Sequence, residues 1–150
     1  MADLKFLYVN ANHSERAQVE LLLLAEERGA DIVCITEPYA RNKKLRVDGW
    51  NVLISGRAAV LLRKSIDGLE LPSTVPDTVL VALPDLTICV CYASPNARLA
   101  DTLEPLLPEL RAVRGRLLVV GDFNCRTSII PGVQTDRRGS LFEDFSRLLD

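Results

Sequence analysis

Hydrophobic residues along this chain occur mostly in short uninterrupted runs, a pattern typical of strands that are buried on both faces. The runs predict strands at residues 5–10, 31–36, 50–54, 58–63, 79–83, 86–92 and 117–120. The strands between residues 50 and 92 follow one another closely, with a tight turn at Pro84-Asp85, and they predict an antiparallel meander.

Residues 15–28 show helical spacing between the first two strands. Ser14 is placed to cap the N-terminus of this helix, and Gly29 is placed to end it. Apolar side chains occupy nearly every position from 21 to 25, so we expect the helix to be covered on more than one side. The strand–helix–strand unit predicts two parallel strands joined by a right-handed crossover.

A second helix is predicted after the meander. Asp101 and Glu104 resemble a capping box that opens a helix reaching about residue 113. Pro105 and Pro108 lie close to its start, which leaves the first turn undefined, because proline lacks the backbone N–H that a helix interior uses.

A last helix is predicted from about Gly139. Its apolar stripe consists of Leu141, Phe142, Phe145, Leu148 and Leu149. A helix with such a stripe needs a surface to pack on, and no further strand follows it, so the domain looks cut short at its C-terminus.

Composition limits the class of protein. The 150 residues are 48% hydrophobic, which suits one globular domain with a sizeable core. The chain has no apolar run of membrane-spanning length and no signal-peptide pattern at its start, so we expect a soluble intracellular protein without membrane contact. The four cysteines form no Cys-x-x-Cys pair and are predicted to be free, mostly buried thiols. A net charge of −2 provides no overall basic field, so any contact with nucleic acid has to be local.

The strand at 117–120 leads into Gly121-Asp122-Phe123-Asn124. Alternation in extended backbone predicts that Asp122 and Asn124 point to the same side. A carboxylate and an amide at a strand end can hold Mg²⁺, a phosphate oxygen or a water molecule. The alternative is an ordinary turn that ends the strand, since Gly, Asp and Asn are common in turns.

Other predicted strands also end in polar residues. Asn10 closes the first strand, Glu37 follows the second and Tyr92 closes the last strand of the meander. Pro38 is expected to hold Glu37 in extended backbone. If the first, second and 117–120 strands are neighbours, Asn10, Glu37 and the Asp122–Asn124 pair meet at one rim and form a magnesium and phosphate site.

These strand-end motifs resemble the endonuclease/exonuclease/phosphatase superfamily, which includes deoxyribonuclease I and the apurinic/apyrimidinic endonucleases. The motifs are Asn10, Thr36-Glu37-Pro38-Tyr39, Tyr92-Ala93-Ser94-Pro95-Asn96 and Gly121-Asp122-Phe123-Asn124. A closer resemblance is to the endonuclease domains of arthropod-type LINE (non-LTR) retrotransposons. It rests on Asn10-Ala11-Asn12-His13, Arg16-Ala17-Gln18 and Thr135-Asp136-Arg137-Arg138-Gly139.

The resemblance implies an α/β fold of four layers, with two packed mixed sheets flanked by helices as in deoxyribonuclease I. It also implies Mg²⁺-dependent cleavage of double-stranded DNA, with Mn²⁺ as a substitute metal, at a nick that primes reverse transcription in the nucleus. In this family pattern Glu37 and Asn10 hold the metal, and Asp122 orients or deprotonates the attacking water. Asn124 binds a phosphate oxygen, and Tyr92 contacts the phosphate or the leaving oxygen.

DNA contacts are expected from residues near the cleft. The candidates are Asn96, the basic loop residues Arg41, Lys43 and Lys44, and the arginines Arg137 and Arg138. Neutralisation of phosphates by such cations makes binding depend strongly on salt. The alternative is that these cations lie on ordinary solvated loops.

One family motif has no match among the 150 residues. The family ends in a Ser-Asp-His motif on a late strand, and the single histidine here, His13, lies before the first helix and is expected to be structural or to face the substrate. Residues 1–150 therefore resemble the first two-thirds of one such domain within a polyprotein that carries a reverse transcriptase. We expect little or no nicking by this chain alone.

Two alternative functions remain open. The first is a phosphoesterase of the same fold that acts on small phosphate esters. The second is a non-catalytic interaction module, in which the apolar stripe of the last helix is covered by another chain or by self-association.

Overall fold

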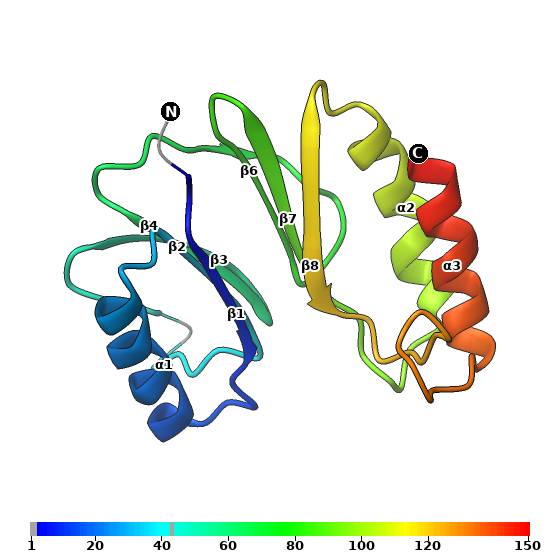
Figure 1. The fold of residues 1–150 in the computed structure, drawn as a ribbon, viewed down its shortest axis with the longest axis horizontal. Helices are drawn as coiled ribbons and strands as arrows, with labels where there is room; N and C mark the ends of the chain where they lie inside the picture. Colours follow the sequence, from blue (N-terminus) through cyan, green and yellow to red (C-terminus); the bar gives the residue numbers. More distant parts are fainter. Residues whose placement is uncertain (1–2, 43) are drawn as a thin grey trace.

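Two four-stranded β-sheets lie at the centre of the molecule (Figure 1). The structure is a computed structural model that describes residues 3–42 and 44–150. The strands are β1 (Phe6–Asn10), β2 (Ile32–Thr36), β3 (Trp50–Ser55), β4 (Ala58–Arg63), β5 (Leu69–Leu71), β6 (Thr78–Ala82), β7 (Leu86–Tyr92) and β8 (Arg116–Asp122). The helices are α1 (Glu15–Arg28), α2 (Leu99–Arg111) and α3 (Arg137–Leu149).

The two sheets are mixed and have helices on their outer faces. One sheet has the strand order β1-β2-β4-β3 and the other has the order β5-β6-β7-β8. The pairs β1–β2 and β7–β8 are parallel, and the other pairs are antiparallel. Helix α1 covers the first sheet, and α2 and α3 cover the second, which gives four layers (Figure 1). The predicted α/β fold of four layers, with two packed mixed sheets flanked by helices, is confirmed.

Separate apolar clusters hold the layers together. Ile32, Val60, Val81 and Ile88 belong to the cluster between the sheets, and all four are fully buried. Burial of each such side chain contributes about 1.5–3 kcal/mol. The alignment of the two sheets therefore rests on this central layer.

Helix α1 has the predicted boundaries. The Ser14 hydroxyl accepts a hydrogen bond from the Ala17 N–H, and Gly29 ends the helix with a φ of 65°. The expectation that α1 is covered on more than one side is wrong, since the Leu23 side chain is 64% exposed and Val19 is also exposed. Only the face of α1 that packs on the first sheet is buried, and the side chains on its other faces are exposed to solvent.

The strands from 50 to 92 do not form one meander. The β3–β4 hairpin lies in the first sheet and the β6–β7 hairpin lies in the second, with the unpredicted strand β5 after the crossing. Each hairpin was predictable from local pattern, because sequential strands with short connections pair. Local pattern does not tell whether two buried hairpins lie side by side in one sheet or face each other across a core.

Helix α2 begins earlier than the predicted capping box. It starts at Leu99, its N-cap residue Arg98 makes no side-chain capping bond, and both prolines lie inside the helix. The buried residues are Leu99, Leu103, Leu106 and Leu110. This apolar spacing of three to four residues continues back to Leu99, and packing on the second sheet outweighs the local capping preference.

Helix α3 packs on α2 through part of its apolar stripe. Phe145 is buried, and Phe142 and Leu149 lie against the same cluster, whereas Leu141 and Leu148 are exposed. The prediction that β8 is buried on both faces is wrong. It forms one edge of its sheet, and its residues are at most partly buried.

The four cysteines are free, as predicted, and three of them are buried. Burial raises the pKa of the Cys34 thiol to about 12 and that of Cys91 to about 11. These thiols are therefore protonated and unreactive at neutral pH. In residues 3–42 and 44–150, no helix is long and apolar enough to cross a membrane.

Candidate active site

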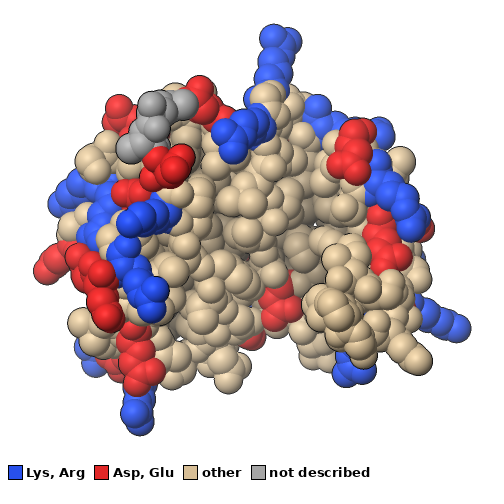
Figure 2. All heavy atoms as spheres, viewed as in Figure 1, with Lys and Arg blue, Asp and Glu red and all other residues tan. Residues whose placement is uncertain are grey.

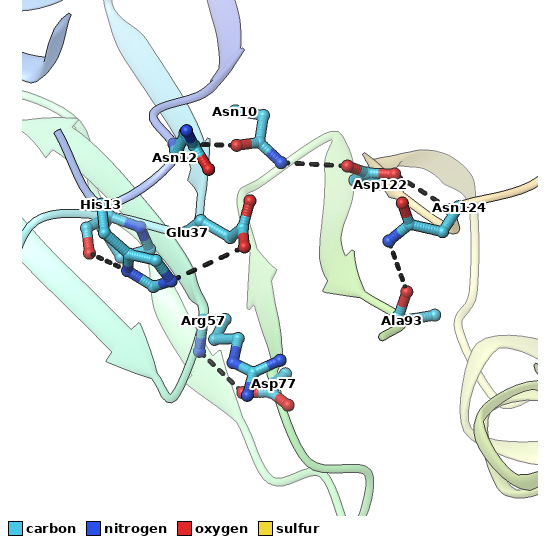
Figure 3. Close-up of polar contacts among 10 residues, drawn as sticks. Asn10, Asn12, His13, Glu37, Arg57, Asp77, Ala93, Asp122 and Asn124 are labelled. Atoms are coloured by element: carbon cyan, nitrogen blue, oxygen red, sulfur yellow. Dashed lines mark hydrogen bonds and ion pairs between the residues drawn. The ribbon is translucent and has the colours of Figure 1, made fainter. Parts of the chain in front are cut away.

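The ends of β1 and β8 meet across the two sheets. The side-chain amide of Asn10, the last residue of β1, donates a hydrogen bond of 2.9 Å to Oδ2 of Asp122, the last residue of β8 (Figure 3). The sequence predicts this meeting if the two strands are neighbours, and β8 does lie next to β1, but across the interface of the two sheets and not within one sheet. The polar groups converge instead at the seam where one sheet packs on the other.

Glu37 lies at the same seam, because β1 and β2 run parallel and end at the same edge. Its φ is 49°, so the extended backbone expected before Pro38 is wrong. The Glu37 N–H donates to the Arg57 carbonyl at 2.8 Å, and the Glu37 carbonyl accepts from the His13 N–H at 2.8 Å. These two bonds hold a left-handed backbone conformation that non-glycine residues rarely adopt.

His13 contacts Glu37 with its side chain as well. Its Nε2 lies 3.6 Å from Glu37 Oε1, and its Nδ1 lies 3.3 Å from the carbonyl oxygen of Pro38 (Figure 3). The His13 side chain is 55% exposed and that of Glu37 is 18% exposed, so the imidazole is more open to solvent than the carboxylate that it contacts. A short turn after Asn10 brings it there, and nothing in the sequence pattern predicted this contact.

The Gly121–Asn124 segment forms a turn that also presents functional groups. The Asn124 N–H donates to Asp122 Oδ1 at 2.9 Å, and the Asn124 side-chain amide donates to the Ala93 carbonyl at 2.8 Å. The predicted alternation is wrong, because the strand ends at Asp122 and Asn124 has a φ of 49°. The strand-ending turn itself therefore carries the Asp122 and Asn124 side chains.

Gly121 is required by a close approach of two strands. A Cβ atom at this position would lie 2.0 Å from the carbonyl oxygen of Cys91 on the paired strand β7. A side chain would push the strands apart just before Asp122. The glycine thus sets the position of the carboxylate that follows it.

Tyr92 is paired with Asp122 in the β7–β8 register and is almost completely buried. The guanidinium carbon of Arg57 lies 5.3 Å from the centre of its ring. Asn96 lies in the loop after β7, where its backbone N–H donates to the Ser94 hydroxyl at 3.2 Å and its side chain is exposed. The structure thus places Tyr92 beside the seam and Asn96 on the loop that follows it.

Tyr8 was not predicted as part of this region. It lies two residues before Asn10 on β1, and its hydroxyl is 2.9 Å from the Thr36 hydroxyl. Burial raises the pKa of Tyr8, although the hydrogen bond to Thr36 lowers it, and the charges of Asp122 and Glu37 add to the rise. The alternation of β1 gives Tyr8 and Asn10 the same face, which was the available signal.

Arg138 has a structural role in place of the expected free cation. Its guanidinium donates to the carbonyls of Asn124 at 2.8 Å, Ala97 at 2.6 Å, Ser94 at 3.0 Å and Phe123 at 3.1 Å. These bonds tie the loop after β7 to the turn after β8. We call this set of contacts the arginine brace. Arg137, in contrast, is exposed.

The basic loop lies beside α1. Arg41 and Lys44 form a tight turn, with the Lys44 N–H donating to the Arg41 carbonyl at 2.9 Å, and both side chains are exposed. Lys43, the third cation predicted here, lies outside the described residues. Arg41 and Lys44 line a groove of about 570 Å³ against α1. Pro38 and Tyr39 connect this loop to Glu37.

The donor set at the seam fits a small, hard cation. Among the described residues, no group of three or more His, Cys, Asp or Glu side chains is placed to hold a metal ion. Glu37 and Asp122 supply carboxylates, and Asn10 supplies an amide oxygen that also accepts from the Asn12 N–H at 2.9 Å. Mg²⁺ is commonly held by one or two carboxylates and keeps several waters, so the chemistry of these donors fits this ion. Figure 2 shows acidic atoms in the hollow between the two halves of the molecule.

No protein-family model matches this sequence, and no curated protein matches it either. Solved structures match well in shape. The endonuclease domain of TRAS1, a telomere-specific non-LTR retrotransposon, has a TM-score of 0.85 at 23% identity, over 97% of this chain and 71% of that chain. The 3′-5′ exonuclease NExo from Neisseria meningitidis has a TM-score of 0.71 at 16% identity, over the same shares of the two chains.

A third structure extends the comparison. An AP endonuclease from Archaeoglobus fulgidus has a TM-score of 0.62 at 19% identity, over 81% of this chain and 58% of that chain. At these identities the likeness establishes the fold. The chain has the two-sheet fold found in these nucleases, and the role of each residue rests on the geometry described above.

Proposed function

We propose that this chain, which has the fold of the deoxyribonuclease I-like nucleases, is a Mg²⁺-dependent DNA endonuclease domain of a non-LTR retrotransposon. The hydrogen bond from Asn10 to Asp122 beside Glu37 carries the proposal, because it gathers metal-binding and water-binding groups from opposite sheets. The likeness to the TRAS1 endonuclease domain and the LINE-type motifs support it. In this proposal the domain belongs to a polyprotein with a reverse transcriptase and nicks double-stranded target DNA in the nucleus.

The reaction is hydrolysis of a phosphodiester bond. A water oxygen bonds to phosphorus while the bond from phosphorus to the 3′-oxygen breaks. The leaving oxygen takes up a proton from solvent, which gives the 3′-hydroxyl that priming requires. Asp122 is suited to orient the water and accept its proton. One lone pair of each carboxylate oxygen is used by the Asn10 amide and the Asn124 N–H, and the second lone pairs stay available.

The remaining roles follow from the same inventory of donors and acceptors. Glu37 and the Asn10 amide oxygen would hold Mg²⁺, which when bound polarises the phosphate and offsets charge on the leaving oxygen. Asn124 uses one amide hydrogen on the Ala93 carbonyl, so its second amide hydrogen is available to a phosphate oxygen. Tyr92 borders this position and would contact the phosphate or the leaving oxygen.

A plasmid-nicking assay tests the proposal. Supercoiled plasmid is incubated with the chain and Mg²⁺, with EDTA and with the Asp122→Ala variant. Because the 150 residues contain no Ser-Asp-His motif, we expect little nicking by this chain alone. That nicking should require Mg²⁺ and disappear in Asp122→Ala. Nicking that persists in this variant, or hydrolysis only of small phosphate esters, would overturn the proposal.

One observation favours a non-catalytic interaction module as a second candidate. Leu141 and Leu148 leave an apolar strip of α3 exposed, although its other apolar residues pack on α2. Self-association through this strip would appear as a dimer in sedimentation velocity, and Leu148→Glu would then restore the monomer. A monomer at high concentration would rule out this role for the strip.

A further inference from the structure

Arg57 occupies a fixed position between Glu37 and Tyr92. Its carbonyl accepts from the Glu37 N–H at 2.8 Å, and its own N–H donates to Asp77 Oδ1 at 2.7 Å. The Asp77 carbonyl in turn accepts from the Tyr92 N–H at 2.9 Å. This series of bonds links the β3–β4 turn of one sheet to the second sheet, so the main chain of Arg57 is held from both sides.

The neighbouring glycine keeps this turn tight. A Cβ atom at Gly56 would lie 2.1 Å from Asp77 Oδ1, and the φ of Gly56 is 55°. The Asp77 carboxylate therefore occupies the space that a side chain would need. Arg57 projects from a turn whose shape depends on this close contact, rather than from a free loop.

The guanidinium of Arg57 is exposed and lies over the Tyr92 ring at 5.3 Å from its centre. This distance is within the range of a cation–π contact, which restricts the long side chain while leaving its N–H groups open. In the part of the chain that the structure describes, no carboxylate forms an ion pair with it. The cation is thus oriented, solvent-accessible and without a charged partner.

We propose that Arg57 binds the phosphate next to the one that is cleaved, on the same nucleic acid strand. The cleaved phosphate lies beside Asn10 and Asp122 in the proposed function, on which this inference rests. Figure 3 shows Arg57 on the side of Glu37 away from Asn10. A planar guanidinium donates two N–H groups to phosphate oxygens and is more weakly hydrated than an ammonium group. The site would therefore select a substrate with at least two consecutive phosphates.

Equilibrium binding tests this assignment without depending on turnover. A fluorescein-labelled 12-base-pair DNA duplex is titrated in EDTA at several salt concentrations, and anisotropy is measured. Arg57→Gln is compared with Lys64→Gln, which removes the same charge at the other end of β4. Arg57→Lys keeps the charge without the planar donor pair. Thermal unfolding of each variant verifies that it is folded.

We expect Arg57→Gln to weaken binding about three- to tenfold and to reduce the slope of log affinity against log salt by about one. Arg57→Lys should keep the slope and lose part of the affinity, and Lys64→Gln should bind like the unchanged chain. Equal affinities of Arg57→Gln and Lys64→Gln for the duplex would overturn the role given to Arg57 and leave the proposed function unaffected. If the unchanged chain binds no duplex, the proposed function falls as well, so the two failures are distinguishable.

Discussion

The side-chain amide of Asn10 lies 2.9 Å from the carboxylate of Asp122, although 112 residues separate them in the sequence. The contact joins the last residue of β1 to the last residue of β8 across the interface of the two sheets. The candidate site therefore depends on tertiary packing more than on either strand alone.

Asn10→Asp places a second carboxylate against Asp122. We expect the variant to lose about 2 kcal/mol of unfolding free energy at pH 7, because like charges replace a part-buried hydrogen bond. The pKa of the pair should rise in the folded state, so this state binds more protons than the unfolded one. The loss should therefore shrink as the pH is lowered toward 4. Urea unfolding at both pH values measures it. The exposed Asn51→Asp adds the same charge and should show no such trend.

Glu37→Gln should remove most of the stabilisation by Mg²⁺. A ligand that binds only the folded chain at ten times its dissociation constant adds about 1.4 kcal/mol, which raises Tm by about 3–5 °C. We expect this rise in the unchanged chain and almost none in Glu37→Gln. Differential scanning fluorimetry with a Mg²⁺ series provides the measurement. Glu20→Gln, at an exposed residue of α1, is the control and should respond to Mg²⁺ normally. An equal response of all three proteins would remove Glu37 from the metal site.

Arg138→Lys should destabilise the chain by about 2 kcal/mol, because a single ammonium group cannot serve the four carbonyls of the arginine brace. Nicking should slow while the salt dependence of DNA binding stays unchanged, since this guanidinium is not free for DNA. Arg137→Gln should show the opposite result, with a smaller salt slope and little loss of stability.

Urea unfolding and anisotropy separate these two arginines. Arg147→Gln is the stability control, because Arg147 is itself exposed and pairs with Glu143 and Asp144 on the same helix, and surface pairs of this kind contribute little. A reduced salt slope for Arg138→Lys would show that Arg138 contacts DNA after all.

Gly121→Ala should separate β7 from β8 just before Asp122. We expect a loss of about 2–4 kcal/mol together with a loss of nicking, because the new Cβ would overlap the Cys91 carbonyl oxygen. Gly132→Ala is the matched control. Gly132 also has a positive φ but nothing near its Cβ position, so its cost should stay near 1 kcal/mol. Chemical denaturation of both variants measures the difference, and equal costs would contradict the role given to Gly121.

Asp136 should make the stability of α3 depend on pH. Hydrogen bonds from the Gly139 and Arg126 N–H groups lower the pKa of its carboxyl below the ordinary 3.8. A lowered folded-state pKa stabilises the fold above the unfolded value, and this contribution is lost as the pH falls through the folded one. Asp136→Asn keeps an acceptor and should remove that acid-side dependence. Melting temperatures between pH 2.5 and 7 test the prediction, and parallel curves for both proteins would contradict it.

Local signals predicted much of the secondary structure. Ser14 and Gly29 mark both ends of α1, and the apolar runs identify the main strands except the short β5. The strand-end residues Asn10, Glu37 and Asp122 were also predicted to converge, because parallel strands present their ends at one edge of a sheet. What the pattern could not supply was the sheet to which each strand belongs, since the same apolar run suits either side of a shared core.

The remaining errors have similar causes. Pro38 favours extended backbone at Glu37, but hydrogen bonds from His13 and to Arg57 hold it in the left-handed region. Arg138 looks like a DNA-binding cation in the sequence, and only the fold shows its carbonyl partners. The contacts of His13 and Arg57 with the site depend on turns that bring distant segments together. The identity of His13 or Arg57 in the sequence does not predict these contacts.

The cluster of Ile32, Val60, Val81 and Ile88 also has a consequence for chemistry. In the proposed function the reacting groups are divided between the layers on either side of this cluster, so a slide of one layer by a fraction of an ångström would misalign them while both layers remain folded. Enzymatic turnover should then fail at a lower urea concentration than circular dichroism does. Removal of a methyl group from this cluster, far from any substrate, would therefore change the rate of catalysis.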